Sequence, residues 1–203
     1  MDIKKGFSIA AGMIIIVATD SCGLRGDDCA DTMYNFEIGI KAYPDKEVLA
    51  IGDTLWLEVA APTELKDKLT GQSVDFSGSK NLSSVVSFAK RDENEDFLIK
   101  AANKFNLLLV KGSYASSGDP DSFYEYRLTE SDGFYRFKLG VVTTEKGIFR
   151  IAFSNATNVS KSQKPCIKAS FEINFVDTEV HYNLFPHFGG DPTKPGAYCF
   201  RVE

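Results

Sequence analysis

The side chains of this chain that could do chemistry are its cysteines and histidines. His181 and His187 lie in a segment rich in aromatic, proline and glycine residues, with Asp177, Glu179 and Asp191 close by in the sequence. Imidazole and carboxylate groups together can bind a metal ion, but their spacing here matches no metal-binding motif. We therefore predict that both histidines are ordinary loop residues, and that the chain binds neither a metal ion nor a cofactor.

Three cysteines, Cys29, Cys166 and Cys199, follow the N-terminal segment and cannot all pair with one another. The sequence has no C-x-x-C motif and no histidine beside a cysteine, so we predict structural rather than catalytic thiols. The alternation of the sequence places Cys166 and Cys199 at outward-facing strand positions. We predict a disulfide between Cys29 and Cys166, which would tie the N-terminal segment to a late strand. Pairing of Cys166 with Cys199 is the alternative.

Four aromatic side chains are candidates for contact with a ligand or partner: Trp56, Tyr182, Phe185 and Phe188. Trp56 falls on the polar side of an alternating run, where an exposed ring can stack on a sugar or anchor a protein. The other three lie in a loop between residues 180 and 196, where flat apolar faces could serve recognition. In the alternative interpretation, a neighbouring loop covers Trp56 and the loop aromatics close the core.

Signatures of enzymatic activity are missing from the sequence. It contains no G-x-S-x-G, no H-E-x-x-H, no phosphate-binding glycine loop and no dinucleotide fingerprint. Two of its 28 acidic residues could meet across a cleft and hydrolyse a glycosidic bond, but nothing nominates a pair. We predict a protein that is not an enzyme and has no catalytic residues, with a small carboxylate-dependent hydrolase as an alternative.

The elements that must position these residues are β-strands, because period-two alternation dominates the chain from Met33 onward. An apolar residue at every second position gives a strand one buried and one exposed face. The clearest alternating runs cover residues 34–41, 54–59, 135–141, 149–154, 171–175 and 198–202.

Turn and helix signals divide these runs. Asp132-Gly133 predicts a hairpin in which residues 124–128 are antiparallel neighbours of residues 135–137. Residues 63–71 fit either a short capped helix or a strand that enters a turn. The apolar spacing from 94 to 105 fits one face of a helix, and this segment is the best helix candidate.

Many short strands without a βαβ rhythm predict an all-β fold, in which two antiparallel sheets pack as an immunoglobulin-like β-sandwich. A closed β-barrel is the alternative. The stretch YPDKEVLAIGDTLWLEV, residues 43–59, resembles the opening strands of immunoglobulin-like modules in bacterial surface proteins. We expect residues 33–203 to form a single domain of this kind.

The N-terminal segment, MDIKKGFSIAAGMIIIVATDSC, has the layout of a secretory signal, with two lysines before an apolar run. A membrane-spanning helix needs about 20 apolar residues, and this run ends before Asp20. With a cysteine directly after the apolar run, the segment resembles the signal peptides of bacterial lipoproteins. The residues before the cysteine depart from the usual cleavage motif and are similar to the looser motifs of Bacteroidota lipoproteins. The resemblance implies that residues 1–21 are a signal peptide, that Cys22 carries acyl chains and that residues 22–32 include a short tether.

Charge and the implied anchor together predict where the protein acts. The net charge of −5 and the scattered basic residues give no footprint for nucleic acid. Asp27, Asp28 and Asp31 resemble the acidic stretch that accompanies display on the outer surface in Bacteroidota lipoproteins. We predict a lipid-anchored, non-enzymatic binding or structural module on the periplasmic or cell-surface face of the outer membrane. Its expected partners are outer-membrane proteins or glycans, and cell-surface carbohydrate binding is the alternative function.

Overall fold

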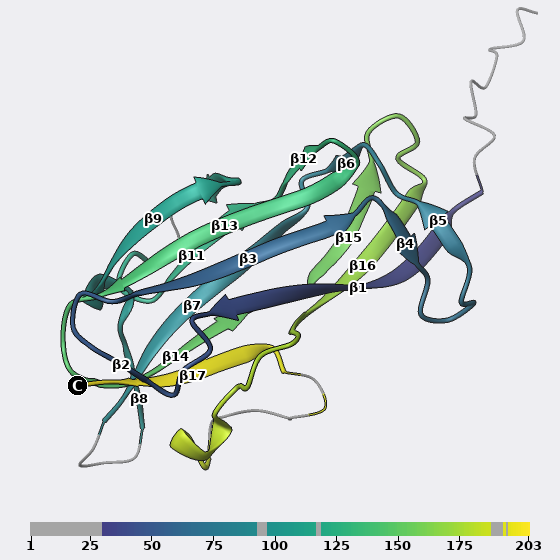
Figure 1. Ribbon diagram of the computed structural model, residues 1–203. Coiled ribbons are helices and arrows are strands. Elements are labelled where there is room, and N and C mark those ends of the chain that lie inside the picture. Colours follow the sequence, from purple (N-terminus) through teal and green to yellow (C-terminus); the bar gives the residue numbers. More distant parts are fainter. Residues whose placement is uncertain (1–29, 93–96, 117–118, 188–192, 194) are drawn as a thin grey trace, which may run out of the picture.

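The alternating runs form strands that lie in two main sheets, as a computed structural model of the chain shows (Figure 1). The structure describes residues 30–92, 97–116, 119–187, 193 and 195–203. Within these ranges the strands divide between two large sheets and one small hairpin. The predicted all-β sandwich is confirmed. The closed barrel is wrong, because the strands fall into separate sheets.

The first sheet has the order β12-β13-β3-β1-β16-β15-β6, and β9 also pairs with β13. Its strands are β1 (Thr32–Tyr43), β3 (Thr54–Pro62), β6 (Ser79–Lys80), β9 (Phe105–Lys111), β12 (Thr129–Ser131), β13 (Phe134–Thr143), β15 (Ala156–Lys161) and β16 (Ile167–Phe175). Neighbouring strands are antiparallel except β1 and β16, which run parallel with Phe36 beside Phe171. Both strands therefore begin at one end of the sandwich and run toward the opposite end.

The second sheet has the order β10-β11-β7-β14-β17-β2, and β8 also pairs with β7. Its strands are β2 (Val48–Leu49), β7 (Ser83–Arg91), β8 (Leu98–Lys100), β10 (Ser113–Ser116), β11 (Phe123–Arg127), β14 (Gly147–Phe153) and β17 (Ala197–Val202). The small hairpin joins β4 (Glu64–Lys66) to β5 (Ser73–Asp75). It lies at the end of the molecule where β1 begins (Figure 1).

Aromatic side chains fill the space between the two main sheets. Tyr126 of β11 lies 5.4 Å from Phe137 of β13, and Phe153 of β14 lies 5.9 Å from Phe175 of β16, measured between ring centroids. These contacts cross from one sheet to the other, so the inward half of each alternating run forms a shared core. Burial of this apolar area is the main favourable contribution to folding.

The Asp132-Gly133 hairpin is confirmed, but its predicted partner strand is wrong. Ser131 pairs with Phe134 across the turn, so β12 is the strand that returns beside β13. Residues 123–127 form β11 in the second sheet instead. The chain crosses between the sheets at Leu128, and the alternation continues across this break, which is why sequence alone joined the two segments.

The helix expected over residues 94–105 is wrong for the part that the structure describes. Residues 98–100 form β8 beside β7, and only a single 3-10 turn, η1 (Ala102–Lys104), follows. Of the two alternatives for residues 63–71, the strand and turn is confirmed by β4. Pairing with β5 supplies backbone hydrogen bonds that an isolated short helix would lack. Throughout the described ranges, no helix is long and apolar enough to cross a bilayer.

Candidate functional site

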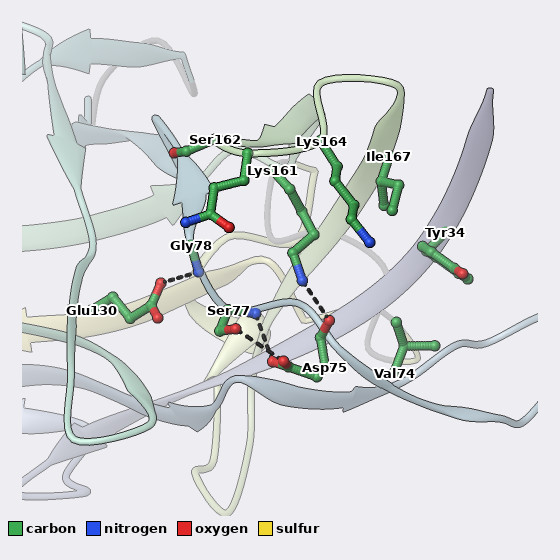
Figure 2. Close-up of a pocket in the computed structure, with 11 residues that line it drawn as sticks. Tyr34, Val74, Asp75, Ser77, Gly78, Glu130, Lys161, Ser162, Lys164 and Ile167 are labelled. Atoms are coloured by element: carbon green, nitrogen blue, oxygen red, sulfur yellow. Dashed lines mark hydrogen bonds between the residues drawn. The ribbon is translucent and has the colours of Figure 1, made fainter. Parts of the chain in front are cut away.

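A cleft of about 600 Å³ opens at the end of the sandwich where β1 and β16 begin (Figure 2). The residues that line it come from β1, β5, β12, β15, β16 and the turns that follow β5 and β15: Tyr34, Val74, Asp75, Ser77, Gly78, Glu130, Lys161, Ser162, Gln163, Lys164 and Ile167. This volume falls within the range of small-molecule sites in proteins.

The turn from Asp75 to Gly78 builds one wall of the cleft. Asp75 accepts hydrogen bonds from the backbone N–H and the hydroxyl of Ser77, at 2.8 and 3.0 Å. Gly78 has φ +69°, a region that glycine adopts without steric cost, and its N–H donates to the Glu130 carboxylate at 2.8 Å. Each of the two carboxylates in the cleft therefore accepts a hydrogen bond from a backbone N–H of this turn.

Two lysines supply the positive charge of the cleft. Nζ of Lys161 donates to the carbonyl oxygen of Asp75 at 2.9 Å and lies 5.8 Å from the ring centre of Phe76. Lys164 is exposed in the turn before β16, and the N–H of Ile167 donates to its carbonyl oxygen at 2.9 Å. Within the described residues Lys164 forms no ion pair. Figure 2 shows both ammonium groups extending into the cleft.

The opposite side of the cleft is apolar and rests on the core. Tyr34, Val74 and Ile167 gather there (Figure 2), and the ring of Tyr34 stacks on Phe36 with centroids 5.7 Å apart. Phe76 lies fully buried below and packs edge-on against Phe36 at 5.4 Å. Because a rigid aromatic floor supports it, the cleft is preformed rather than assembled on binding.

The groups that line the cleft are suited to binding a ligand. An apolar wall beside ammonium, amide and hydroxyl groups suits an amphiphilic ligand whose polar part carries acceptor oxygens. The Asp75 carboxyl is unsuited to donate a proton, because hydrogen bonds from Ser77 lower its pKa. Among the described carboxyl groups with a resolved shift, namely Glu58, Asp67, Asp75, Asp119 and Glu145, every pKa is lowered. A glycosidase acid needs the opposite shift, so these groups give the hydrolase alternative no support.

Trp56 lies on the outer face of the first sheet, in the register that its sequence position predicts. It pairs with Tyr43 of β1 on one side and Gly140 of β13 on the other. A Cβ atom added to Gly140 would stand 2.9 Å from the indole ring, so the ring extends across β13 in space that only glycine leaves open. Leu108 of β9 continues the row beyond Gly140 and is 47% exposed.

The indole of Trp56 is partly exposed and has a charged neighbour instead of the covering loop considered in the sequence interpretation. The ammonium of Lys138 lies 5.1 Å from the Trp56 ring centre and 5.3 Å from that of Tyr43. Glu58 accepts a hydrogen bond from the Tyr43 hydroxyl at 2.6 Å and forms an ion pair with Lys138 at 3.4 Å. These contacts lower the pKa of Glu58, with the Tyr43 hydrogen bond as the largest cause.

The loop aromatics fold back onto the second sheet. Phe185 is buried and packs with Leu184 and Cys199, so the prediction that it presents a face to a partner is wrong. Tyr182 is partly buried, and its hydroxyl accepts a hydrogen bond from the N–H of Ala197 at 3.3 Å. Phe188 lies outside the described residues. The loop folds back because β17 leaves an apolar outer surface, which the loop covers.

Cys199 is free and fully buried, which overturns its alternative pairing with Cys166. Its outward register on β17 is as the alternation indicates, but Leu184 and Phe185 cover the thiol. Burial raises the pKa of Cys199 to about 12, so the closed structure holds it as an unreactive thiol. Cys22 and Cys29 lie outside the described residues.

His181 is also buried, at 7% exposed, whereas His187 is exposed. Asp45, Glu47 and Glu179 carry oxygens 3.7 to 3.9 Å from the ring nitrogens of His181. Across the described ranges no group of three metal-ligating side chains is placed to hold an ion. Asp191, the remaining residue of the imagined metal site, lies outside those ranges.

Sequence reasoning missed the cleft because its residues come from five separate elements and form no motif. The available signals were weak. Tyr34 begins an alternating run, and Lys161 and Lys164 flank a Ser-Gln turn. No protein-family model matches the chain, and no curated protein matches it significantly.

Proposed function

We propose that this chain is a bacterial lipoprotein of the Bacteroidota type, anchored through Cys22 and acting at the outer membrane as a non-enzymatic binding module. The observation that carries the binding role is the preformed cleft, with its apolar wall and two lysines. Its ligand is an amphiphilic molecule whose polar part is rich in acceptor oxygens.

The position of the cleft supports this function. β1 begins at Thr32, ten positions after Cys22, and Tyr34 on the same strand lines the cleft. An extended chain spans at most about 3.6 Å per residue, so ten residues reach about 36 Å. Acylation of Cys22 would therefore hold the cleft close to the membrane surface, where amphiphilic ligands are concentrated.

A disulfide between Cys29 and Cys166 is part of the proposal. Cys199 is free and buried, so Cys166 is the described cysteine that such a bridge would use. The N–H of Thr32, three positions after Cys29 in the sequence, donates to the carbonyl oxygen of Cys166 at 3.1 Å. Such a bridge would fix the start of β1 beside the cleft and needs an oxidising compartment, as export provides.

The anchor is tested by replacing Cys22 with serine. We expect the variant to move from the membrane to the soluble fraction, while Cys199→Ser, as a control for a lost thiol, stays at the membrane. Continued membrane association of Cys22→Ser would contradict the lipid anchor.

The binding role is tested by capture of lipids, glycans and proteins from native membranes, identified by mass spectrometry. Lys164→Glu reverses one exposed charge in the cleft, and we expect it to lose a ligand that the wild type retains. Lys168→Glu reverses the charge of an exposed β16 residue that does not line the cleft, and it serves as the matched control. Equal capture by all three proteins would refute a ligand in the cleft.

Carbohydrate binding on the Trp56 face is a second candidate, favoured by the partly exposed indole that lies across Gly140. Aromatic rings stack on the apolar faces of sugars, and Glu58 and Lys138 could hydrogen-bond their hydroxyls. Affinity electrophoresis in soluble polysaccharides would test it. Tyr114, an exposed aromatic residue of β10 in the second sheet, provides the control. Retardation that Trp56→Ala abolishes and Tyr114→Ala retains would support this candidate, and unretarded wild-type protein would rule it out for those polysaccharides.

A further inference from the structure

The cleft at the start of β1 and β16 holds charges of both signs that do not pair with one another. Lys161 and Lys164 carry the positive charges, and Asp75 and Glu130 carry the negative charges. Among the residues that the structure describes, neither lysine forms an ion pair with either carboxylate. Opposite charges that share a cleft without neutralising each other are each available to a complementary group of a ligand.

The apolar and charged groups are separated along the cleft. Figure 2 shows the apolar wall on one side, Glu130 on the opposite side and the two lysine ammonium groups between them. The strand order agrees with this separation. Tyr34 and Ile167 belong to the neighbouring strands β1 and β16, whereas Glu130 belongs to β12 at the edge of the same sheet. The cleft therefore presents an apolar, a cationic and an acidic region in that order.

Of the two carboxylates, Glu130 is the one with bonding capacity left for a ligand. Both oxygens of Asp75 accept hydrogen bonds from Ser77, at 2.8 and 3.0 Å. Glu130 is exposed, and only its Oε2 accepts a hydrogen bond from the described residues, from the N–H of Gly78 at 2.8 Å. A carboxylate oxygen is an acceptor only, so the open Oε1 suits a donor that carries positive charge.

We propose that the cleft binds a zwitterionic phospholipid of the phosphoethanolamine type. Its acyl chain lies against Tyr34 and Ile167, its phosphate binds the lysine ammonium groups, and its own ammonium binds Glu130. Such a lipid carries an apolar chain, an anionic phosphate and an ammonium group in the same order as the regions of the cleft. An anionic phospholipid without an amine would leave the Glu130 charge unpaired and facing a ligand of like sign, which disfavours it. This assignment rests on the proposed function, whose amphiphilic ligand it names.

Competition between two phospholipids tests the role of the ammonium group. The full chain, purified in a non-ionic detergent, is mixed with equimolar phosphatidylethanolamine and phosphatidylglycerol that have identical acyl chains. Native mass spectrometry then counts each lipid bound to the protein. The two lipids share the phosphate and the chains and differ in the ammonium group. We expect the ethanolamine lipid to be bound in about two- to fivefold excess, as for one partly screened ion pair.

Glu130→Gln identifies the group that selects the ammonium. The amide oxygen of glutamine can still accept the hydrogen bond from Gly78, so this variant removes the charge and keeps the turn. We expect it to bind the two lipids in nearly equal amounts. Glu179→Gln removes an exposed carboxylate after the other end of β16 and, as the matched control, should retain the excess.

Lys164→Gln tests the phosphate position separately. Because both lipids carry the phosphate, we expect this variant to bind less of each by the same factor and to leave their ratio unchanged. Lys168→Gln, an exposed lysine of β16 that does not line the cleft, should bind both lipids as the wild type does. A loss confined to the ethanolamine lipid in Lys164→Gln would contradict the assigned order of the groups.

A further arm separates a lipid from a soluble compound with the same headgroup. Glycerophosphoethanolamine lacks acyl chains and cannot use the apolar wall, so at equal concentration it should displace little of the bound ethanolamine lipid. Displacement as effective as that by unlabelled lipid would overturn the lipid assignment.

Two results would overturn the phosphoethanolamine ligand as a whole: equal binding of the two lipids by the wild type, or an excess that Glu130→Gln retains. If Lys164→Gln still weakens the binding of both lipids, the proposed amphiphile-binding function stands without this ligand. Binding of neither lipid would also overturn the proposal, and capture from native membranes, compared between wild type and Lys164→Glu, then decides the proposed function independently.

Discussion

The cleft lies at one end of the parallel strands β1 and β16. The segment from Asp177 to His187, here called the clasp, lies at their other end and covers the outer surface of β17. β1 and β16 both begin at the cleft, with Tyr34 and Ile167, and both lead to the clasp, toward Asp45 and Asp177. The cleft rests on Phe76, which is fully buried in the main core. The clasp rests on a separate small cluster of Leu184, Phe185 and Cys199. One end of the sandwich therefore rests on the main core, and the other rests on a separate small cluster.

The largest expected effect comes from removing the floor of the cleft. Phe171 of β16 packs 5.5 Å from Phe36 and 5.6 Å from Phe76, so Phe171→Ala leaves a cavity among rings that cannot collapse into it. We expect a loss of about 3–5 kcal/mol in the free energy of unfolding, measured by urea denaturation. A loss below that of Phe185→Ala would reverse the proposed difference between the two ends.

A smaller effect is expected from the same type of substitution in the clasp. Phe185→Ala empties part of the small cluster, and the surface segment can settle into the space. We expect a loss of about 1–2 kcal/mol, below the usual range for a core phenylalanine, together with faster labelling of Cys199. Unchanged labelling would show that Phe185 does not secure the cover of the thiol.

The cleft wall should respond to acid through Asp75. Hydrogen bonds from Ser77 lower the pKa of Asp75. The stabilisation that the Asp75 carboxylate gives to the cleft wall is therefore present above the ordinary carboxyl pKa range and is lost as the pH falls through the lowered pKa. We expect the backbone N–H resonance of Ser77 to shift below about pH 4, the ordinary carboxyl range, in an NMR titration. A Ser77 resonance that moved only near neutral pH would contradict this assignment.

The smallest effect on stability is expected from Asp75→Asn, because the Asp75 carboxyl is exposed and largely screened by solvent. This variant should remove the acid-dependent shift of Ser77 and lower the thermal midpoint by less than Phe185→Ala does. A larger loss than that of Phe185→Ala would mean that the turn from Asp75 to Gly78 contributes more to folding than to shaping the cleft.

The strands could be predicted from sequence, but their partners could not. Alternation marked β1, β3, β13, β14, β16 and β17, because each buries one face in a shared core. It could not tell that β11 belongs to the second sheet, since crossing at Leu128 leaves the pattern intact. The expected helix over 94–105 failed because pairing of β8 with β7 outweighs a weak helical spacing.

The candidate sites were less predictable than the strands. The sequence indicated the outward position of Trp56, which depends only on strand parity. It gave no sign that Phe185 and His181 are buried, because their burial depends on a loop that folds over β17. The cleft depends on how β1, β5, β12, β15 and β16 lie relative to one another, and local sequence patterns carry no information on that placement.

The most direct test of binding through the cleft is to map ligand contacts on the whole surface at once. Backbone amide resonances of the mature domain would be recorded before and after addition of a detergent-solubilised extract of native membranes. We predict shifts confined to the cleft, at Tyr34, Val74 to Gly78 and Lys161 to Ile167, which Lys164→Glu reduces. Shifts centred on Trp56 or on the clasp, or no shifts at all, would contradict the account.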